Sequence, residues 1–355
     1  MLFANDFTRR LGLDHPLVQA PMAGETSTVP LSLEASKAGA LGSLGAAYFT
    51  PAKLRDSIRA MRSGTDRSFA VNLFIPVPWG RDPAREAAYA AEIARAHQAL
   101  GLEPPQPPAQ IEESFEAQMQ VVLEEAPPVF SSTFGAPDAD LVTALQQRSI
   151  YVIGTATTVA EALVLKQRGV DAIIAQGAEA GGHRGSFLKP FSQSMIGTMA
   201  LVPQIVDATG LPVLAAGGIG DGRGVAAALC LGASAAALGS AFLLSPESGA
   251  SAAYRAALTS PAQTETTITR AFSGRPARGL RNDFLERLEG REEIIPDYPI
   301  PNAWSRPMRQ AAARQGEAGY LSLWAGQAAA MTKPEPVATI VARVMAQAKA
   351  VLGET

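Results

Sequence analysis

The sequence predicts an α/β protein in which a (β/α)8 TIM barrel carries a smaller helical second domain. Eight short apolar segments alternate with segments long enough for helices, as in a parallel sheet whose strands are buried between helices. The chain has 355 residues, which is enough for one barrel of about 250 residues and a further unit. A doubly wound sheet is the alternative, and the count of eight strands favours the barrel.

Each expected strand is short and apolar on both faces. The expected strands are Leu17–Ala20, Leu41–Leu44, Phe69–Phe74, Val129–Ser132, Tyr151–Ile153, Ala172–Gln176, Val213–Ala216 and Ala235–Leu238. Thr158 followed by Glu161 predicts a capping box that opens a helix ending near Gly169. Asp221 is expected to cap a later helix, which Gly232 ends.

Residues 76–128 are too many for a simple connection between two barrel strands. They contain an expected helix over Pro83–Leu100, a Pro-rich break, and a second expected helix over Glu112–Glu125. We therefore expect residues 1–245 to form the barrel, with this helical insertion within it.

Residues 246–355 follow the eighth expected strand and are rich in helices and loops. Within them, the segment IIPDYPIPNAWSRP (residues 294–307) is expected to lack regular structure because of its prolines. We expect 246–355 to form a cap domain over the barrel mouth, part of which packs back on the barrel.

Composition excludes several classes of protein. The net charge of −3 gives no electrostatic reason to expect a nucleic-acid partner. The single cysteine, Cys230, cannot form an internal disulfide, and it is expected to be buried and inert in a helix. The uncharged stretch Val225–Leu244 predicts a buried helix, a Gly turn and a strand rather than a membrane span. Because the N-terminus lacks a signal-peptide pattern, we expect a cytoplasmic protein.

Glycines gather after the seventh and eighth expected strands. The seventh runs into AAGGIGDGRG (residues 215–224), and the eighth runs into Gly239 and Ser240. Glycine lets backbone N–H groups approach an anion, and these loops of a barrel often bind phosphate. The pattern predicts a site for a phosphorylated ligand, with tight turns that bind nothing as the alternative.

The loop after the sixth expected strand, QGAEAGGHRGSF (residues 176–187), places His183 among glycines at the barrel mouth. An imidazole there can accept a proton or hydrogen-bond an anion, whereas the alternative is a surface histidine. His15 and His97 are expected to be structural. No cluster of ligands has metal-binding spacing, so no metal site is expected.

Seven segments together resemble the nitronate monooxygenase family, formerly called 2-nitropropane dioxygenases. They are QAPMAG (19–24), FAVNLF (69–74), GTATTVAEA (154–162), DAIIAQGAEAGGHRG (171–185), PVLAAGGIGDGRGVAAALCLGA (212–233), SGRPARGL (273–280) and SLWAGQ (322–327). They span most of the chain in the order found in the family. The resemblance implies an FMN enzyme built on a barrel with a helical second domain.

The resemblance also implies a set of FMN contacts, drawn from the barrel loops. They are Met22, Asn72, Gln176, Gly181, Gly217, Gly218, Ala237, Leu238, Gly239 and Ser240. Relatives often carry Gln at position 237, so Ala237 can contribute only a backbone contact.

By the same resemblance, His183 is the active-site histidine. Family members also place tyrosines and a cation from the second domain near the substrate. Tyr254 and Tyr298 are the candidate tyrosines, with helix packing as the alternative role of Tyr254. Arg306 and Lys189 are the candidate cations.

The implied reaction is FMN-dependent oxidative denitrification, in which an alkyl nitronate and O2 give a carbonyl compound and nitrite. Propionate 3-nitronate, a plant and fungal toxin, is a candidate substrate, and its handling would be detoxification. One alternative is an FMN-dependent NAD(P)H reductase acting on enoyl-acyl-carrier protein or a quinone. Another is a flavin-binding protein without catalytic activity. The oligomeric state is left open.

Overall fold

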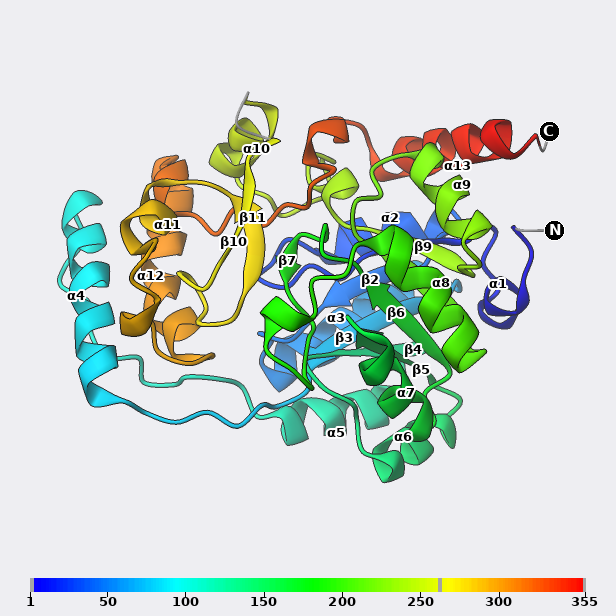
Figure 1. Ribbon diagram of the computed structural model, residues 1–355, viewed down its shortest axis with the longest axis horizontal. Coiled ribbons are helices and arrows are strands. Elements are labelled where there is room, and N and C mark those ends of the chain that lie inside the picture. Colours follow the sequence, from blue (N-terminus) through cyan, green and yellow to red (C-terminus); the bar gives the residue numbers. More distant parts are fainter. Residues whose placement is uncertain (1–2, 261–263, 354–355) are drawn as a thin grey trace.

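In the computed structural model, which describes residues 3–260 and 264–353, eight parallel strands form a barrel surrounded by helices (Figure 1). The barrel strands are β1 (Leu17–Gln19), β2 (Gly42–Gly45), β3 (Phe69–Phe74), β4 (Val129–Thr133), β5 (Tyr151–Ala156), β6 (Ala172–Gln176), β8 (Val213–Ala216) and β9 (Ala235–Leu238). They pair in the order β1-β9-β8-β6-β5-β4-β3-β2. Val18 of β1 bridges Leu41, next to β2, and this bridge closes the barrel. The predicted fold class is confirmed.

Helices between and around these strands cover the outside of the barrel (Figure 1). They are α2 (Val29–Lys37), α3 (Pro51–Gly64), α5 (Phe115–Glu125), α6 (Ala139–Gln146), α7 (Val159–Gln167), α8 (Thr198–Thr209), α9 (Gly222–Cys230) and α13 (Val337–Leu352). Helix α1 (Asp6–Leu11) differs, because its Phe7 and Leu11 pack with the inward-pointing side chains of the strands. The segment expected as helix, turn and strand rather than a membrane span forms α9, a turn at Gly232 and β9. Among the described residues, no helix is long and apolar enough to cross a bilayer.

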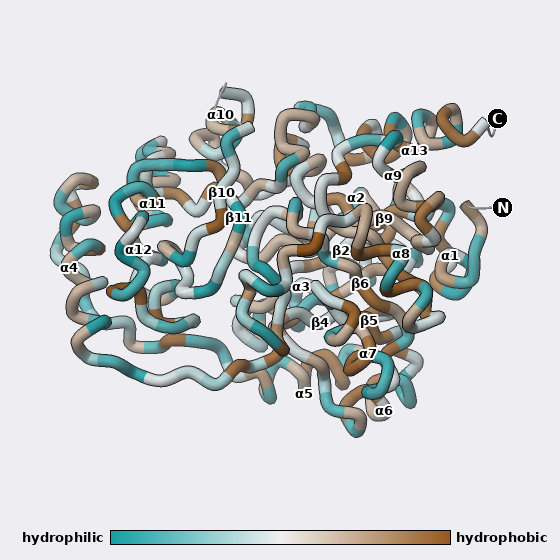
Figure 2. The backbone as a smooth tube through the Cα atoms, viewed as in Figure 1, coloured by the Kyte–Doolittle hydropathy of each residue, from teal (hydrophilic) through white to brown (hydrophobic). Residues whose placement is uncertain are grey.

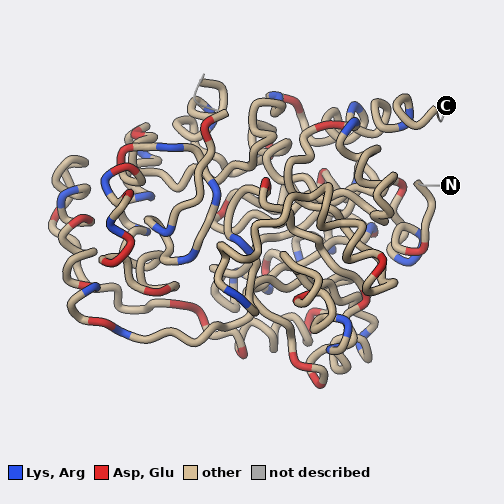
Figure 3. Tube along the Cα trace, in the orientation of Figure 1, with Lys and Arg blue, Asp and Glu red and all other residues tan. Residues whose placement is uncertain are grey.

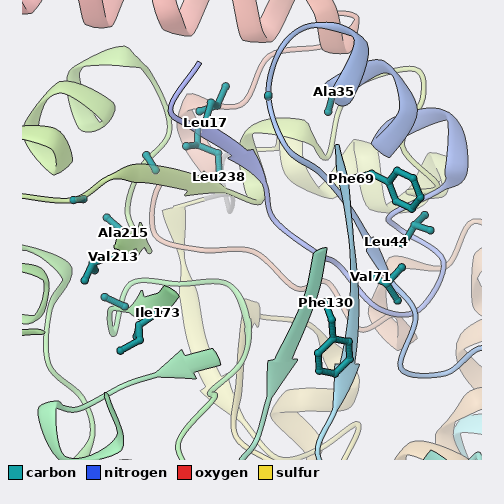
Figure 4. Close-up of a cluster of buried hydrophobic side chains, with 14 of the residues drawn as sticks. Leu17, Ala35, Leu44, Phe69, Val71, Phe130, Ile173, Val213, Ala215 and Leu238 are labelled. Atoms are coloured by element: carbon teal, nitrogen blue, oxygen red, sulfur yellow. The ribbon is translucent and has the colours of Figure 1, made fainter. Parts of the chain in front are cut away.

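Two layers of apolar side chains hold the barrel together. On β3, Phe69 and Val71 point towards the helices, and Ala70 points into the barrel. On β6, Ile173 points outward and Ile174 inward. Figure 4 shows the outer layer, to which several strands and α2 contribute, and Figure 2 shows hydrophobic segments gathered in the barrel. Burial of each large apolar side chain there contributes about 1.5–3 kcal/mol to the free energy of unfolding.

A second group of elements packs around an apolar core of its own, beside the barrel (Figure 1). It comprises α4 (Pro83–Ala99), β7 (Gly182–His183), α10 (Ala252–Thr259), β10 (Thr266–Thr269), β11 (Ala277–Leu280), α11 (Asp283–Leu288), η4 (Glu292–Ile294), α12 (Ile300–Gln315), η5 (Ala318–Tyr320) and η6 (Ala329–Met331). Of the remaining short elements, η1 (Phe191–Gln193) lies in the loop after β7, and η2 (Ser240–Phe242) packs in the barrel core. Strand β11 pairs antiparallel with both β10 and β7. The short strand β7 therefore ties the loop after β6 to this second group.

The insertion after β3 divides between the two groups. Helix α4 packs against α12, whereas α5 packs against α3 of the barrel. At the other end of the chain, α13 packs against α9 and α2. Each group is therefore assembled from segments that are distant in sequence. Figure 3 shows Lys and Arg interspersed with Asp and Glu in both of them, in keeping with the small net charge.

The expectation that residues 294–307 lack regular structure is wrong for their second half, because α12 begins at Ile300. Pro301 lies in the first turn, where its missing N–H costs no helical hydrogen bond. Pro307 lies inside the helix and does remove one. Apolar residues at helical spacing, including Trp304 and Met308, are buried on one face of α12, and this packing outweighs the loss.

Two local expectations also need correction. Cys230 is exposed, because it ends α9 on the face opposite the buried Val225 and Leu229. The Thr158 side chain does accept a hydrogen bond from the Glu161 N–H, as in a capping box. The Glu161 carboxylate, however, does not accept one from the Thr158 N–H. That buried carboxylate instead accepts hydrogen bonds from the N–H of Thr157, at 2.7 Å, and of residues in the loop after β6.

The contact between α9 and α13 generates a prediction for Gly222. A methyl group there would lie 2.3 Å from the Val344 carbonyl oxygen and 2.5 Å from the Ala348 nitrogen, so the two helix backbones would have to separate. We expect Gly222→Ala to lower the free energy of unfolding by about 1–3 kcal/mol, measured by urea denaturation. Gly80→Ala is the control, because nothing lies within 4 Å of its added methyl group. Equal stability of the two variants would contradict this packing.

Candidate active site

A cavity of about 480 Å³ lies at the carboxyl ends of the barrel strands and extends to α12. Six strands contribute lining residues in their carboxyl-terminal halves, and β3 and β6 contribute two each. These residues are Asn72, Phe74, Thr133, Thr155, Ile174, Gln176, Ala216 and Ala237. Parallel strands in a barrel bring their carboxyl ends to one rim, so residues far apart in sequence meet there.

The wall formed by the turns after β8 and β9 offers free backbone donors. Gly217 and Gly218 have positive φ angles of 114° and 69°, which glycine adopts without strain. In the described part of the chain, the N–H groups of Gly218, Gly239 and Ser240 donate to no acceptor. Several N–H groups on adjacent turns can therefore bind one anionic group.

The helix N-termini beside these turns are already capped. The Glu179 carboxylate accepts a hydrogen bond at 3.0 Å from the N–H of Thr198, the first residue of α8. The Asp221 carboxylate accepts one at 2.9 Å from the N–H of Arg223 in α9. Anion binding at this wall would therefore depend on the turn N–H groups rather than on a helix terminus.

Two amide side chains at the strand ends have different tasks. The Asn72 Nδ2 donates to the Ser131 hydroxyl at 2.9 Å, which leaves Oδ1 as an acceptor without a partner in the described residues. The Gln176 amide is fully used within its own loop. Its Nε2 donates to the His183 carbonyl at 2.9 Å, and its Oε1 accepts from the Gly185 N–H at 2.8 Å. Gln176 thus fixes the loop that carries His183.

The structure brings most of the predicted cofactor residues to this cavity. Those that line it are Met22, Asn72, Gln176, Gly181, Gly217, Gly218, Ala237, Gly239 and Ser240. Leu238 does not line it, because alternation along β9 turns its side chain into the layer between strands and helices. Gly181 lines it, but a Cβ there would lie 2.5 Å from the Gly326 nitrogen. Gly181 is therefore needed where two chain segments cross.

His183 lies in the cavity wall, surrounded by aromatic rings. The centroids of the Phe134 and Trp324 rings are each 5.6 Å from the centroid of its imidazole. Its Nε2 lies 2.8 Å from the Ser273 hydroxyl oxygen. Ser273 also lines the cavity, and it belongs to the turn between β10 and β11.

The pKa of His183 is lowered to about 3. Burial is the largest cause of this decrease, and the positive charges of Arg275 and Arg309 contribute the rest. In the described residues, no carboxylate faces the ring to oppose this effect. His183 is therefore a neutral imidazole at physiological pH. Burial also lowers the pKa of Arg275 to about 10, which still leaves that guanidinium charged.

One face of α12 forms the cavity wall opposite the barrel rim. Its lining residues, at helical spacing, are Asn302, Arg306, Arg309, Gln310 and Ala313. Arg309 donates through Nε to Ser305 and through Nη2 to Asn302, but Nη1 has no partner in the described residues. No carboxylate of those residues pairs with Arg309, so this wall carries uncompensated positive charge. The spacing could have revealed this face, but its prolines argued against a helix.

The candidate substrate residues differ in where they lie. Arg306 lines the cavity, whereas Lys189 is exposed and does not. Tyr254 lines the cavity, but its hydroxyl donates to the Trp324 carbonyl. Tyr298 stacks edge-on against His183 at a centroid distance of 6.2 Å and does not line the cavity itself.

The chemistry of the cavity follows from its three parts. The free N–H groups of the turns suit a phosphate, and the free Asn72 oxygen suits a ring N–H. A neutral base and the arginine-bearing wall of α12 suit an acidic or anionic substrate. The described residues contain no group of three or more His, Cys, Asp or Glu side chains that could hold a metal ion.

Comparison with known proteins agrees with this arrangement. The family model described as nitronate monooxygenase matches residues 7–347. Probable nitronate monooxygenases from Staphylococcus aureus strains MSSA476 and Newman are each 42% identical over 344 residues, which cover 97% of both chains.

Solved structures with a similar fold were also found. A nitroalkane oxidase from Streptomyces ansochromogenes superposes with a TM-score of 0.90 at 38% identity, covering 98% of this chain and 100% of that one. FabK from Thermotoga maritima superposes with a TM-score of 0.74 at 28% identity, covering 99% and 97%. The family model and the Staphylococcus relatives each cover nearly the whole chain, and on these grounds the chain belongs to the nitronate monooxygenase family of oxidoreductases.

Proposed function

We propose that this enzyme uses FMN to oxidise alkyl nitronates with O2, releasing a carbonyl compound and nitrite. The observation that carries the proposal is that one cavity is lined by a neutral, half-buried His183, by turns with free backbone N–H groups and by the positively charged face of α12. A nitronate is a small anion with its charge on oxygen. The arginines of the α12 wall would hold that charge and so orient the substrate in the cavity.

Observations in the cavity support FMN in particular. The free N–H groups of Gly218, Gly239 and Ser240 would hold a terminal phosphate. The free Asn72 Oδ1 would accept from a ring N–H of the isoalloxazine. Met22 and Ala237 line the same cavity. When bound, FMN would supply the redox chemistry by accepting electrons from the substrate and passing them to O2.

The residues of this chain bind and orient the substrate. Arg306 and the free Nη1 of Arg309 would hold the oxygens of an anionic nitro group. The Trp324 ring, which lines the cavity beside His183, would keep water away from the reacting carbon. If the substrate enters as a neutral nitroalkane, His183 can take the proton from the carbon next to nitrogen.

Propionate 3-nitronate is our proposed substrate, which makes detoxification the proposed role. Its carboxylate gives it a second negative charge, and the α12 wall holds two arginines within three residues of each other. The tyrosines would shape this end of the cavity rather than carry charge, because burial raises the pKa of Tyr298 well above its usual value. Residues 246–355, apart from α13, which packs back on the barrel, would act as the cap over the barrel mouth. We place the reaction in the cytoplasm, without a nucleic-acid partner.

His183→Ala should keep its flavin and lose most turnover of nitroethane. Removal of the base should lower kcat/KM by about 10²–10⁴-fold, measured as nitrite released under air. His15→Ala is the control, because His15 precedes β1, away from the cavity. Near-normal kcat/KM in His183→Ala would show that His183 is not the base.

The pH profile should reflect the lowered pKa of His183. A pKa of about 3 means that the neutral base is already fully present above about pH 5. We therefore expect kcat/KM for nitroethane to stay level from about pH 8 down to about pH 5. A decrease centred near pH 6.5, the usual pKa of histidine, would contradict the burial of this ring.

Gly218→Val should lose the cofactor. The new side chain would impose strain at a φ of 69° and crowd the turn that would hold the phosphate. Gly12→Val is the matched control, since its φ of 63° imposes similar strain at a site with nothing within 4 Å. We expect the flavin-to-protein absorbance ratio to fall for Gly218→Val alone. Equal occupancy in both variants would count against the assigned phosphate turn.

A further inference from the structure

Ser273 makes three hydrogen-bonding contacts through one hydroxyl group. Its oxygen lies 2.8 Å from the His183 Nε2, 3.1 Å from the Arg275 carbonyl oxygen and 3.2 Å from the Arg275 nitrogen. A serine hydroxyl has one hydrogen to donate and can accept two. The Arg275 N–H must donate to it, so the single hydroxyl hydrogen goes either to the Arg275 carbonyl or to His183.

Only one of these choices satisfies all the groups. If the hydroxyl donates to His183, the Arg275 carbonyl has no donor in the described residues. If it donates to that carbonyl, His183 donates from Nε2, and all three contacts become hydrogen bonds. Unsatisfied buried polar groups cost about 1–3 kcal/mol, which favours the second choice.

The second choice determines what the other nitrogen of His183 can do. A neutral imidazole carries one hydrogen, so a hydrogen on Nε2 leaves a lone pair on Nδ1. Nδ1 has no hydrogen-bond partner in the described residues. Nδ1 is also not one of the side-chain atoms that are completely buried without a partner, so part of its surface is accessible. It is therefore the nitrogen of His183 that remains open to the cavity.

The backbone around Ser273 is firmly held, so its hydroxyl is a fixed reference for the ring. Gly274 has a φ of 84°, and a Cβ there would lie 2.7 Å from the Tyr298 nitrogen. The Gly274 N–H donates to the Arg270 carbonyl at 2.8 Å, and the Arg270 Nε donates back to the Gly274 carbonyl at 2.8 Å. Strand β7 holds His183 itself in register with Ala277.

We infer that Ser273 is a positioning residue that fixes His183 as the Nε2–H tautomer and presents the Nδ1 lone pair to the substrate. This inference rests on the proposed function and extends it. With a neutral nitroalkane, the C–H bond next to nitrogen breaks, its proton forms an N–H bond at Nδ1, and its electron pair stays on the substrate as the nitronate. A preformed nitronate needs no such step, and its oxygens must be held by the α12 arginines.

The tautomer can be measured directly, without turnover. The chain has three histidines, so ¹⁵N-histidine labelling of the flavin-loaded protein gives few signals, and His183→Gln assigns those of His183. We expect the His183 Nε2 in the protonated range and Nδ1 in the unprotonated range. In Ser273→Ala this pattern should be lost or averaged. A hydrogen on Nδ1 in the wild type, or unchanged signals in Ser273→Ala, would overturn the inference.

Kinetics provide the second measurement. Removing a group that orients a functional histidine costs about 10–100-fold, so Ser273→Ala should lower kcat/KM for nitroethane by that factor. Turnover of ethyl nitronate should change by less than about 3-fold, and Ser273→Thr, which keeps the hydroxyl, should restore much of the nitroethane activity. Equal losses with both substrates would overturn the positioning role. If the wild type oxidises neither, the proposed function fails, and the ¹⁵N spectrum still decides the tautomer.

Discussion

The burial of His183 without an opposing negative charge is the constraint on which the site depends. Four aromatic rings surround the imidazole, and Arg275 and Arg309 contribute positive charge nearby. Such an environment favours the neutral ring, which can act as a base, and it also favours an anion in the adjacent cavity. The positive charge thus favours binding of an anionic ligand, and the neutral imidazole can form such an anion by taking a proton from a carbon acid.

The two groups of elements have to meet for this environment to exist. The barrel supplies the strand ends, while the second group supplies Ser273 and the α12 wall. The loop after β6 joins them, because β7 pairs with β11 and the Gln176 amide holds the same loop from the barrel side. The buried Glu161 carboxylate fixes the far end of that loop through Phe187 at 2.6 Å. His183 therefore lies on a segment anchored at three points.

Much of this arrangement could be predicted from the sequence, and the reasons are physical. The barrel strands are apolar on both faces, which leaves few other environments for them, and glycines mark the turns of the cavity wall. The α12 wall was missed because Pro301 and Pro307 argue against a helix, whereas burial of Trp304 and Met308 stabilises one. The exposure of Cys230 was missed because an Ala-rich helix gives no clear apolar face. The link between Ser273 and His183 joins residues 90 apart in sequence, so no local pattern indicates it.

The most direct test of this account is the visible spectrum of the purified protein after anaerobic mixing with propionate 3-nitronate in the absence of NADH. We predict that the absorbance of an oxidised flavin is lost on mixing and returns when O2 is admitted, with release of nitrite. A flavin that stays oxidised with the nitronate but is bleached by NADH would contradict the account and would indicate a reductase. A flavin that responds to neither would indicate a binding protein without this activity.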